Sequence, residues 1–343
     1  MSTYQVGTKR YFASANGFGG FRSNFAKVFT PKDVESLFVI KGGPGTGKST
    51  LMREIANHHK NDSDITYIHC SSDPRSLDAI ILNKNGCKIA VADGTSPHAI
   101  EPKYPGAFET LIDLGKGFKL SELAEMKNDI ITFTNEKSSA YENAYHHLDL
   151  AGQTAYKIHN ILVKSGIYHK AELLVKQMIN ADQNAKNQYS SSPLLLSAFC
   201  KDGLVRFSKE TDNKRMIKIS GDGISEYLIM EALRSYAATS IGGVSYCSAL
   251  CENMTDFIEL SDYIICVGTV ENSFDSSALV KDMDDYSSLK DVYDQNLNEA
   301  RMYLKKASEY HFKLEKIYSA RIDFTANDKT LQYMLDKIDK ITK

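Results

Sequence analysis

The stretch that most constrains the fold of this chain is residues 36–55, where an apolar run meets a glycine-rich turn and then a helical pattern. Gly42, four further residues and then Gly47-Lys48-Ser49 match the phosphate-binding pattern GxxxxGK[ST], and a flanking strand and helix are the context that this motif requires. Glycines let the backbone turn its N–H groups inward, and the positive end of the next helix points at the same place. We therefore expect a P-loop that binds a polyphosphate.

The residue types after the glycines predict how a nucleotide would be held. Lys48 is expected to reach the β- and γ-phosphates of ATP, and the Ser49 hydroxyl is expected to ligate Mg²⁺. ATP and Mg²⁺ are therefore the expected cofactors. The expected nucleotide-binding residues are Gly42, Gly43, Pro44, Gly45, Thr46, Gly47, Lys48, Ser49 and Thr50.

A second motif follows the P-loop helix. Residues 65–70 are predicted to form a strand, residues 75–82 a short helix, and residues 88–93 another strand that ends in Asp93. Four apolar residues followed by a carboxylate form a Walker-B pattern. Because the ends of parallel strands share one edge of a sheet, Asp93 is expected to reach Mg²⁺ beside Ser49.

The residue that activates water is not assigned by the sequence. Many P-loop ATPases use a glutamate directly after the Walker-B carboxylate, and here Gly94 follows Asp93. Asp73, His98 and Glu101 are the candidates, and Asp73 is the one included with Lys48 and Asp93 in the predicted catalytic set. For each candidate an ordinary role in loop packing or capping is the competing interpretation.

Composition limits the class of protein. A chain of 343 residues with a formal net charge of −2 is long enough for about two domains and lacks the basic footprint of a general nucleic-acid binder. Met1–Gly7 has no basic region followed by an apolar core, and no apolar run approaches the ~18–20 residues that span a bilayer. A cytoplasmic location without membrane or nucleic-acid partners is expected.

The six cysteines form no CxxC pair, and we expect reduced thiols. A zinc site is the alternative, although the ligand spacing of a structural zinc site is missing. Its ligands would be His69, Cys70, Cys247 and Cys251.

From residue 120 the chain becomes helical in character, with apolar residues at helical spacing and Gly166 as the expected break of a helical hairpin. The second half then repeats the first. Seven positions between 300 and 317 match positions between 144 and 161 at one constant offset, for instance 300 − 144 = 156. Upstream, residues 194–198 resemble residues 11–15, and residues 216–219 resemble 38–41.

The second copy has lost the chemistry of the first. When the two P-loop helices are aligned, Glu226 stands where the first copy has its lysine, Tyr227 where it has its serine, and Val267 where it has Asp93. A carboxylate repels a polyphosphate that a lysine attracts, and tyrosine is too large to replace a Mg²⁺-ligating serine. The second copy is expected to serve as a scaffold or regulator.

These patterns predict an α/β protein with two tandem P-loop NTPase-like cores, each a mostly parallel sheet flanked by helices and followed by a helical hairpin. The expected segments are 1–119 for the intact core, 120–190 for its hairpin, 191–283 for the degenerate core and 284–343 for the last hairpin.

Residues 42–50 together with 69–74, 93–98 and 102–106 resemble a bacterial family of tandem-duplicated P-loop ATPases, some of which are labelled nucleotide kinases. The resemblance covers essentially the whole chain and implies nucleotide binding. In that family the second copy often carries its own Gly-Lys-Ser/Thr loop, and this chain departs there.

Three functions remain open at the sequence level. The first is an ATPase that couples hydrolysis to movement of its helical arms. The second is a nucleotide or small-molecule kinase, which is ranked lower because only Arg53 and Arg75 lie near the motifs to neutralise a transferred phosphoryl group. The third is a non-enzymatic ATP sensor or assembly protein that contacts a protein partner through its helical hairpins.

Overall fold

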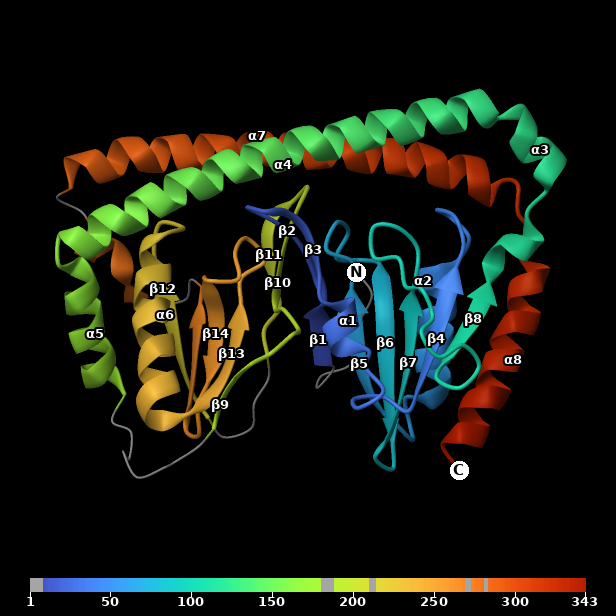
Figure 1. Cartoon of the computed structure of the whole chain (residues 1–343), viewed down its shortest axis with the longest axis horizontal. Coiled ribbons are helices and arrows are strands. Elements are labelled where there is room, and N and C mark those ends of the chain that lie inside the picture. The colour runs from blue at the N-terminus through green and yellow to red at the C-terminus, as the bar shows by residue number, and fades with distance from the viewer. Residues whose placement is uncertain (1–8, 180–187, 210–213, 269–272, 281–282) are drawn as a thin grey trace.

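The computed structural model describes residues 9–179, 188–209, 214–268, 273–280 and 283–343. Two α/β units lie side by side, and two long helices, α4 (Lys127–Lys164) and α7 (Asp284–Ser319), run across both (Figure 1). The prediction about Met1–Gly7 lies outside the described residues. In the part of the chain that is described, no helix combines the length and the apolar character that a membrane span requires.

The first unit is built on a six-stranded sheet with the order β1-β5-β6-β7-β4-β8. Every strand is parallel to its neighbours except β6, which is antiparallel to both β5 and β7. The two strands expected to carry the site, β4 and β7, are adjacent and parallel, with Ile40 opposite Asp93. The strand bounds are β1 Lys9–Phe12, β4 Ser36–Lys41, β5 Asp64–His69, β6 Leu77–Lys84, β7 Cys87–Asp93 and β8 Glu109–Asp113.

The second sheet repeats the first strand for strand, in the order β9-β13-β14-β15-β12-β16. Its antiparallel member, β14, stands in the place of β6. Equal strand order and equal strand directions indicate a tandem duplication of one α/β domain, as the sequence repeat predicts. The bounds are β9 Tyr189–Ser191, β12 Arg215–Ser220, β13 Gly243–Cys247, β14 Thr255–Glu259, β15 Tyr263–Val267 and β16 Phe274–Asp275.

Two local predictions are corrected. The short helix expected over residues 75–82 is instead the central strand β6, because an apolar run buried on both faces of a sheet shows no alternation that separates it from a helix. The second core also begins earlier than residue 191, since Tyr189 starts β9 and pairs with β13. The helical segments start at Leu120 with α3 (Leu120–Glu125) and at Asp284 with α7.

One helix packs on each sheet directly after the loop that follows β4 or β12. α2 (Lys48–His59) buries Met52 and Ile55 on the first sheet, and α6 (Ser225–Tyr236) buries Met230 and Leu233 on the second. Both pairs are related by the same offset, 230 − 52 = 233 − 55 = 178. The alignment of the two helices is therefore confirmed by their buried faces.

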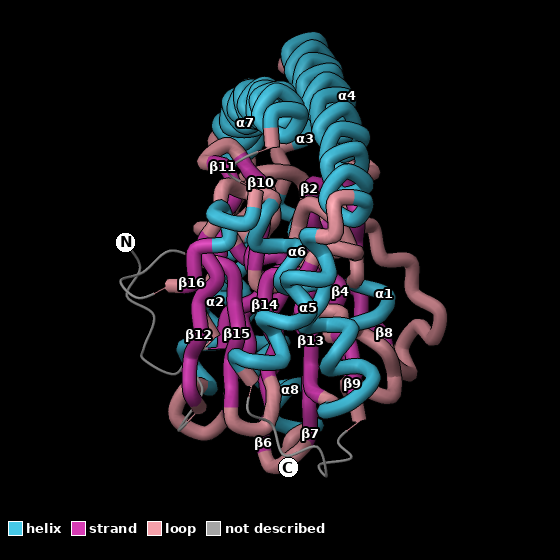
Figure 2. Tube along the Cα trace, turned by 90° about the vertical axis from the view of Figure 1, so that its left-hand side faces the viewer, coloured by secondary structure: helices cyan, strands magenta, loops and turns pink. Residues whose placement is uncertain are grey.

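The helices that follow the cores differ from the expected hairpins. α4 packs antiparallel along α7, above the sheets (Figure 2). α5 (Ile167–Met178) then packs against α6 of the second core, and α8 (Thr325–Ile341) packs against α2 of the first core. Each repeat thus places its terminal helix on the core of the other repeat.

Buried side chains explain why α5 and α8, the arms of the two repeats, each pack on the core of the other repeat. Ile167 and Ala171 of α5 join the hydrophobic cluster of the second core, whereas Met334 and Ile338 of α8 join that of the first. Helical periodicity reveals which face is buried but not which surface covers it. Gly166 adopts a φ of +76° between α4 and α5, so the expected helix break lies at this glycine.

The two repeats meet about a pseudo-twofold axis. Phe12 N donates to Leu195 O and Leu195 N donates to Phe12 O, both at 2.8 Å. These residues are counterparts, since the offset 195 − 12 = 183 also relates Gly20 to Gly203. The remaining elements are β2 Ser14–Gly17, β3 Gly20–Ser23, β10 Ser197–Cys200, β11 Gly203–Arg206, α1 Phe25–Val28 and the short helices η1 Leu114–Gly117, η2 Ala237–Ile241 and η3 Ser276–Leu279.

Candidate functional site

The loop between β4 and α2, residues 42–47, is called the first loop. Gly45 and Gly47 adopt φ values of +71° and +88°, in the left-handed region that favours glycine. A Cβ on Gly42 would lie 2.7 Å from Thr46 Oγ1, so this position also has no room for a side chain. α2 begins after Gly47 without a side-chain cap, which leaves the positive end of the helix facing the loop.

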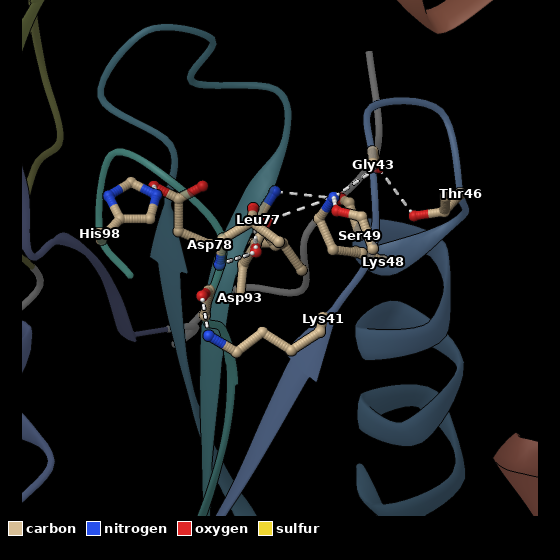
Figure 3. A network of polar contacts seen from close by, with 12 residues as sticks. Lys41, Gly43, Thr46, Lys48, Ser49, Leu77, Asp78, Asp93 and His98 are labelled. Atoms are coloured by element: carbon tan, nitrogen blue, oxygen red, sulfur yellow. Dashed lines mark hydrogen bonds and ion pairs between the residues drawn. The ribbon is translucent and has the colours of Figure 1, made fainter. Parts of the chain in front are cut away.

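Lys48 is the central cation of the site (Figure 3). Its Nζ donates to Gly42 O at 3.0 Å and to Gly43 O at 2.8 Å, and lies 3.6 Å from Asp93 Oδ2. The Lys48 and Asp93 side chains are 12% and 13% exposed. The parallel register of β4 and β7 brings the two predicted motifs together as a nearly buried ion pair.

Asp93 is held in place by the residue two positions further on. Its Oδ1 accepts hydrogen bonds from Thr95 N at 2.9 Å and from Thr95 Oγ1 at 2.6 Å. Lys41 Nζ holds the loop that follows Asp93 in place, because it donates to Gly94 O at 2.8 Å and to Ile100 O at 2.9 Å. The other carboxylate oxygen, Oδ2, is left facing Lys48.

Ser49 links the start of α2 to the start of β6. Its Oγ accepts hydrogen bonds from Leu77 N at 3.0 Å and from Arg53 Nη1 at 2.8 Å. A metal ion at this hydroxyl would therefore displace one of these donors, and Arg53 has the movable side chain. Of the other loop residues, Thr46 is buried and donates to Gly43 O at 2.9 Å, whereas Thr50 is exposed.

The three candidates for the catalytic base occupy different surroundings. Asp73 pairs with the exposed guanidinium of Arg75 at 3.1 Å. Glu101 has an 87% exposed side chain that lies 3.5 Å from Lys41 Nζ. His98 is buried and stacks on Phe25 with ring centroids 4.7 Å apart. Of these three candidates, only His98 is buried.

Asp78, which no sequence motif indicated, is the partner of His98. It is the second residue of β6, it is 5% exposed, and its Oδ2 lies 3.4 Å from His98 Nε2. The pKa of Asp78 is raised to about 6, chiefly by burial; the charge of His98 opposes this rise and the charge of Asp93 adds to it.

Two buried atoms of this pair have no hydrogen bond among the described residues, Asp78 Oδ2 and His98 Nδ1. An unmade hydrogen bond in the interior is costly and calls for an explanation, of which a catalytic role is one. The available sequence signal was a single carboxylate inside an otherwise apolar run, and the helix predicted over residues 75–82 concealed it.

The first loop is covered by the arm of the second repeat. Asn327 Nδ2 donates to Thr46 O at 3.0 Å, and Glu315 O would lie 2.6 Å from a Cβ on Gly45. Tyr318, at the end of α7, contacts the ring of Phe118 with centroids 5.4 Å apart. The site therefore contains residues from both repeats.

The corresponding loop of the second core, residues 221–225, is called the second loop. Here Glu226 Oε2 accepts from Gly223 N at 3.1 Å, and Asp222 Oδ1 accepts from Ser225 N at 3.0 Å. Two carboxylates of the chain thus occupy backbone donors at the start of α6. An external polyphosphate would meet these negative charges.

The strand ladder corrects the alignment of the second loop by one residue. Ile219 lies opposite Val267 as Ile40 lies opposite Asp93, so the strand offset is 219 − 40 = 179, although the following helices are offset by 178. The second loop is therefore one residue shorter, and Ile219, not Lys218, takes the place of Ile40.

The zinc alternative finds no support. Both ring nitrogens of His69 are engaged, since Nδ1 lies 2.7 Å from Pro74 O and Nε2 accepts from Arg10 at 3.2 Å. Within the described residues no three side chains of metal-ligand type gather, and all six cysteines are free thiols.

The chain matches no protein-family model, no curated protein and no solved structure.

Proposed function

We propose that the first core binds ATP with Mg²⁺ at the first loop and hydrolyses the β–γ phosphoanhydride, while the second core serves as a scaffold. The observation that supports this proposal most directly is the ion pair between Lys48 and Asp93. The two charged groups lie 3.6 Å apart, beside a loop with glycines at positive φ. The second core has neither residue and provides an internal comparison. The same function is what the sequence resemblance to duplicated P-loop ATPases implies.

The donor set of the first loop suits a nucleoside triphosphate. The loop amides and Lys48 would hold the phosphates, with Lys48 exchanging its contacts to Gly42 O and Gly43 O for phosphate oxygens. Ser49 and Asp93 would hold Mg²⁺. When bound, the ion neutralises charge that develops on the transferred phosphoryl group.

Asp78 is the group that we assign as the base. During hydrolysis a water oxygen bonds to the γ-phosphorus, the bond from that phosphorus to the β–γ bridging oxygen breaks, and the water proton passes to the Asp78 carboxylate. A carboxylate with a pKa of about 6 is ionised at neutral pH and is basic enough to take this proton. His98, 3.4 Å away, would orient it.

The direct test is phosphate release from ATP by the purified chain, with Mg²⁺ and without any added acceptor. Release above that of the Lys48→Ala variant is the expected result. Tight binding of ATP without release would contradict the ATPase and would favour a kinase that requires its acceptor, or an ATP sensor.

The second core leads to a prediction about stoichiometry. Because Glu226 and Asp222 occupy the donors of the second loop, one nucleotide should bind per chain. Calorimetric titration with ATP should give a ratio near one, and Lys48→Ala should weaken that single site. A ratio of two would show that the second core binds as well.

A further inference from the structure

Helix α4 runs above the edge of the first sheet where the parallel strands β5, β7 and β4 end (Figure 1). Tyr141 of α4 donates from its hydroxyl to Ser72 Oγ at 3.1 Å, and Ser72 follows β5 on this edge. One turn later Tyr145 donates to Asn16 Oδ1 at 3.1 Å. Lys137 precedes Tyr141 by four residues and therefore shares this face of the helix.

The internal repeat identifies the residue of α7 that corresponds to Lys137 on this face of α4. α4 and α7 are equivalent at an offset of 156, and the counterparts Ala144 and Ala300 are both fully buried. At the same offset, 293 − 156 = 137, so Tyr293 of α7 is the counterpart of Lys137.

α7 reaches the second loop, because Tyr286 donates to Asp222 Oδ2 at 2.6 Å, and Tyr293 follows two turns later on the same face of the helix. Tyr293 is buried, and its pKa is raised. Burial is the largest cause, and the negative charges of Glu226, Asp294 and Asp222 add to it. Glu226 is the counterpart of Lys48. The pseudo-twofold relation therefore predicts that Lys137 lies over the first loop as Tyr293 does over the second.

Lys137 is a cation without an anion. It is half-buried, burial alone lowers its pKa, and it makes no ion pair or hydrogen bond with any described residue. A partly desolvated ammonium group is unfavourable unless a negative charge reaches it. The site that the pseudo-twofold relation places beneath Lys137 is the one to which we assign a polyphosphate.

We propose that Lys137 contacts the terminal phosphate of the nucleotide bound at the first loop. This inference rests on the proposed function and adds a second lysine, supplied by the long helix rather than by the core. Since α4 packs along α7, the contact makes the helix pair sensitive to whether the bound nucleotide is a triphosphate or a diphosphate.

The test compares the affinity of the full chain for the β,γ-imido analogue of ATP with its affinity for ADP, both with Mg²⁺ and measured by calorimetry. Lys137→Gln should weaken binding of the triphosphate analogue about tenfold or more, the effect of one lost charge-assisted hydrogen bond, and leave ADP affinity unchanged. Lys137→Arg keeps the charge and should retain most of the preference. The control is Lys157→Gln, an exposed lysine of the same helix, which should behave as the wild type.

The outcomes separate this inference from the function on which it rests. If the wild type binds the analogue and Lys48→Ala loses it, but Lys137→Gln keeps the wild-type preference over ADP, the Lys137 contact is refuted and the nucleotide site stands. Equal losses for analogue and ADP would also refute a contact with the terminal phosphate. If the wild type and Lys48→Ala bind neither nucleotide, both proposals fail.

Discussion

Replacing Lys48 by alanine should lower the affinity for ATP by roughly 10- to 100-fold, because one charge-assisted contact to phosphate is lost. Turnover should fall at least as far, since charge on the transferred group grows in the transition state. Calorimetry with ATP and Mg²⁺ measures the first effect, and phosphate release measures the second.

The matched control for this variant is Lys60→Ala, which removes an exposed lysine at the far end of α2. It should bind ATP as the wild type does. Lys48→Ala also leaves Asp93 without its cation, so the melting temperatures of both variants should be compared. Unchanged ATP affinity in a folded Lys48→Ala chain would refute the assignment of the first loop.

Replacing Asp78 by asparagine should reduce turnover by about 100- to 10,000-fold, the usual contribution of a general base. ATP affinity should be retained, because Asp78 is assigned to the water rather than to the phosphates. The wild-type rate should rise with pH through about 6, as Asp78 loses its proton, and the asparagine variant should lack this rise. Rates of phosphate release between pH 5 and 8 test both statements.

The sign of the pKa shift supplies an independent check of folding. The native pKa of about 6 lies above the ordinary value, so the native state binds more protons than the unfolded state and loses stability as pH rises toward 6. Above that pH the ionised carboxylate destabilises the fold. The asparagine variant should therefore melt no lower than the wild type at neutral pH, and a large fall would indicate a structural role.

Two further variants complete this test: Asp64→Asn is the matched control, and Asp73→Asn tests the competing candidate for the base. Asp64→Asn, at an exposed position on β5, should have wild-type turnover. If Asp73→Asn abolished turnover and Asp78→Asn did not, the assignment from sequence would hold and the assignment from geometry would be wrong.

The packing of α5 and α8 on the opposite cores shows why the sequence pattern did not predict which surfaces these helices cover. Periodicity identified the buried face of the long helices, and the constant offset identified their equivalence. Neither property specifies that Met334 packs on the first core or that Ala171 packs on the second. Those contacts depend on where the two helices carry the chain after crossing both sheets.

The sequence by itself determined the glycine-rich turn, the lysine at the start of its helix, the strand that ends in Asp93 and the duplication. Each is a local pattern, in which backbone preference and spacing carry the information. Tertiary structure alone decided that Asp78 meets His98 and that the arm of one repeat covers the loop of the other. The reason is physical: strand register and helix packing bring together residues far apart in the chain, and local propensity does not encode which distant surfaces meet.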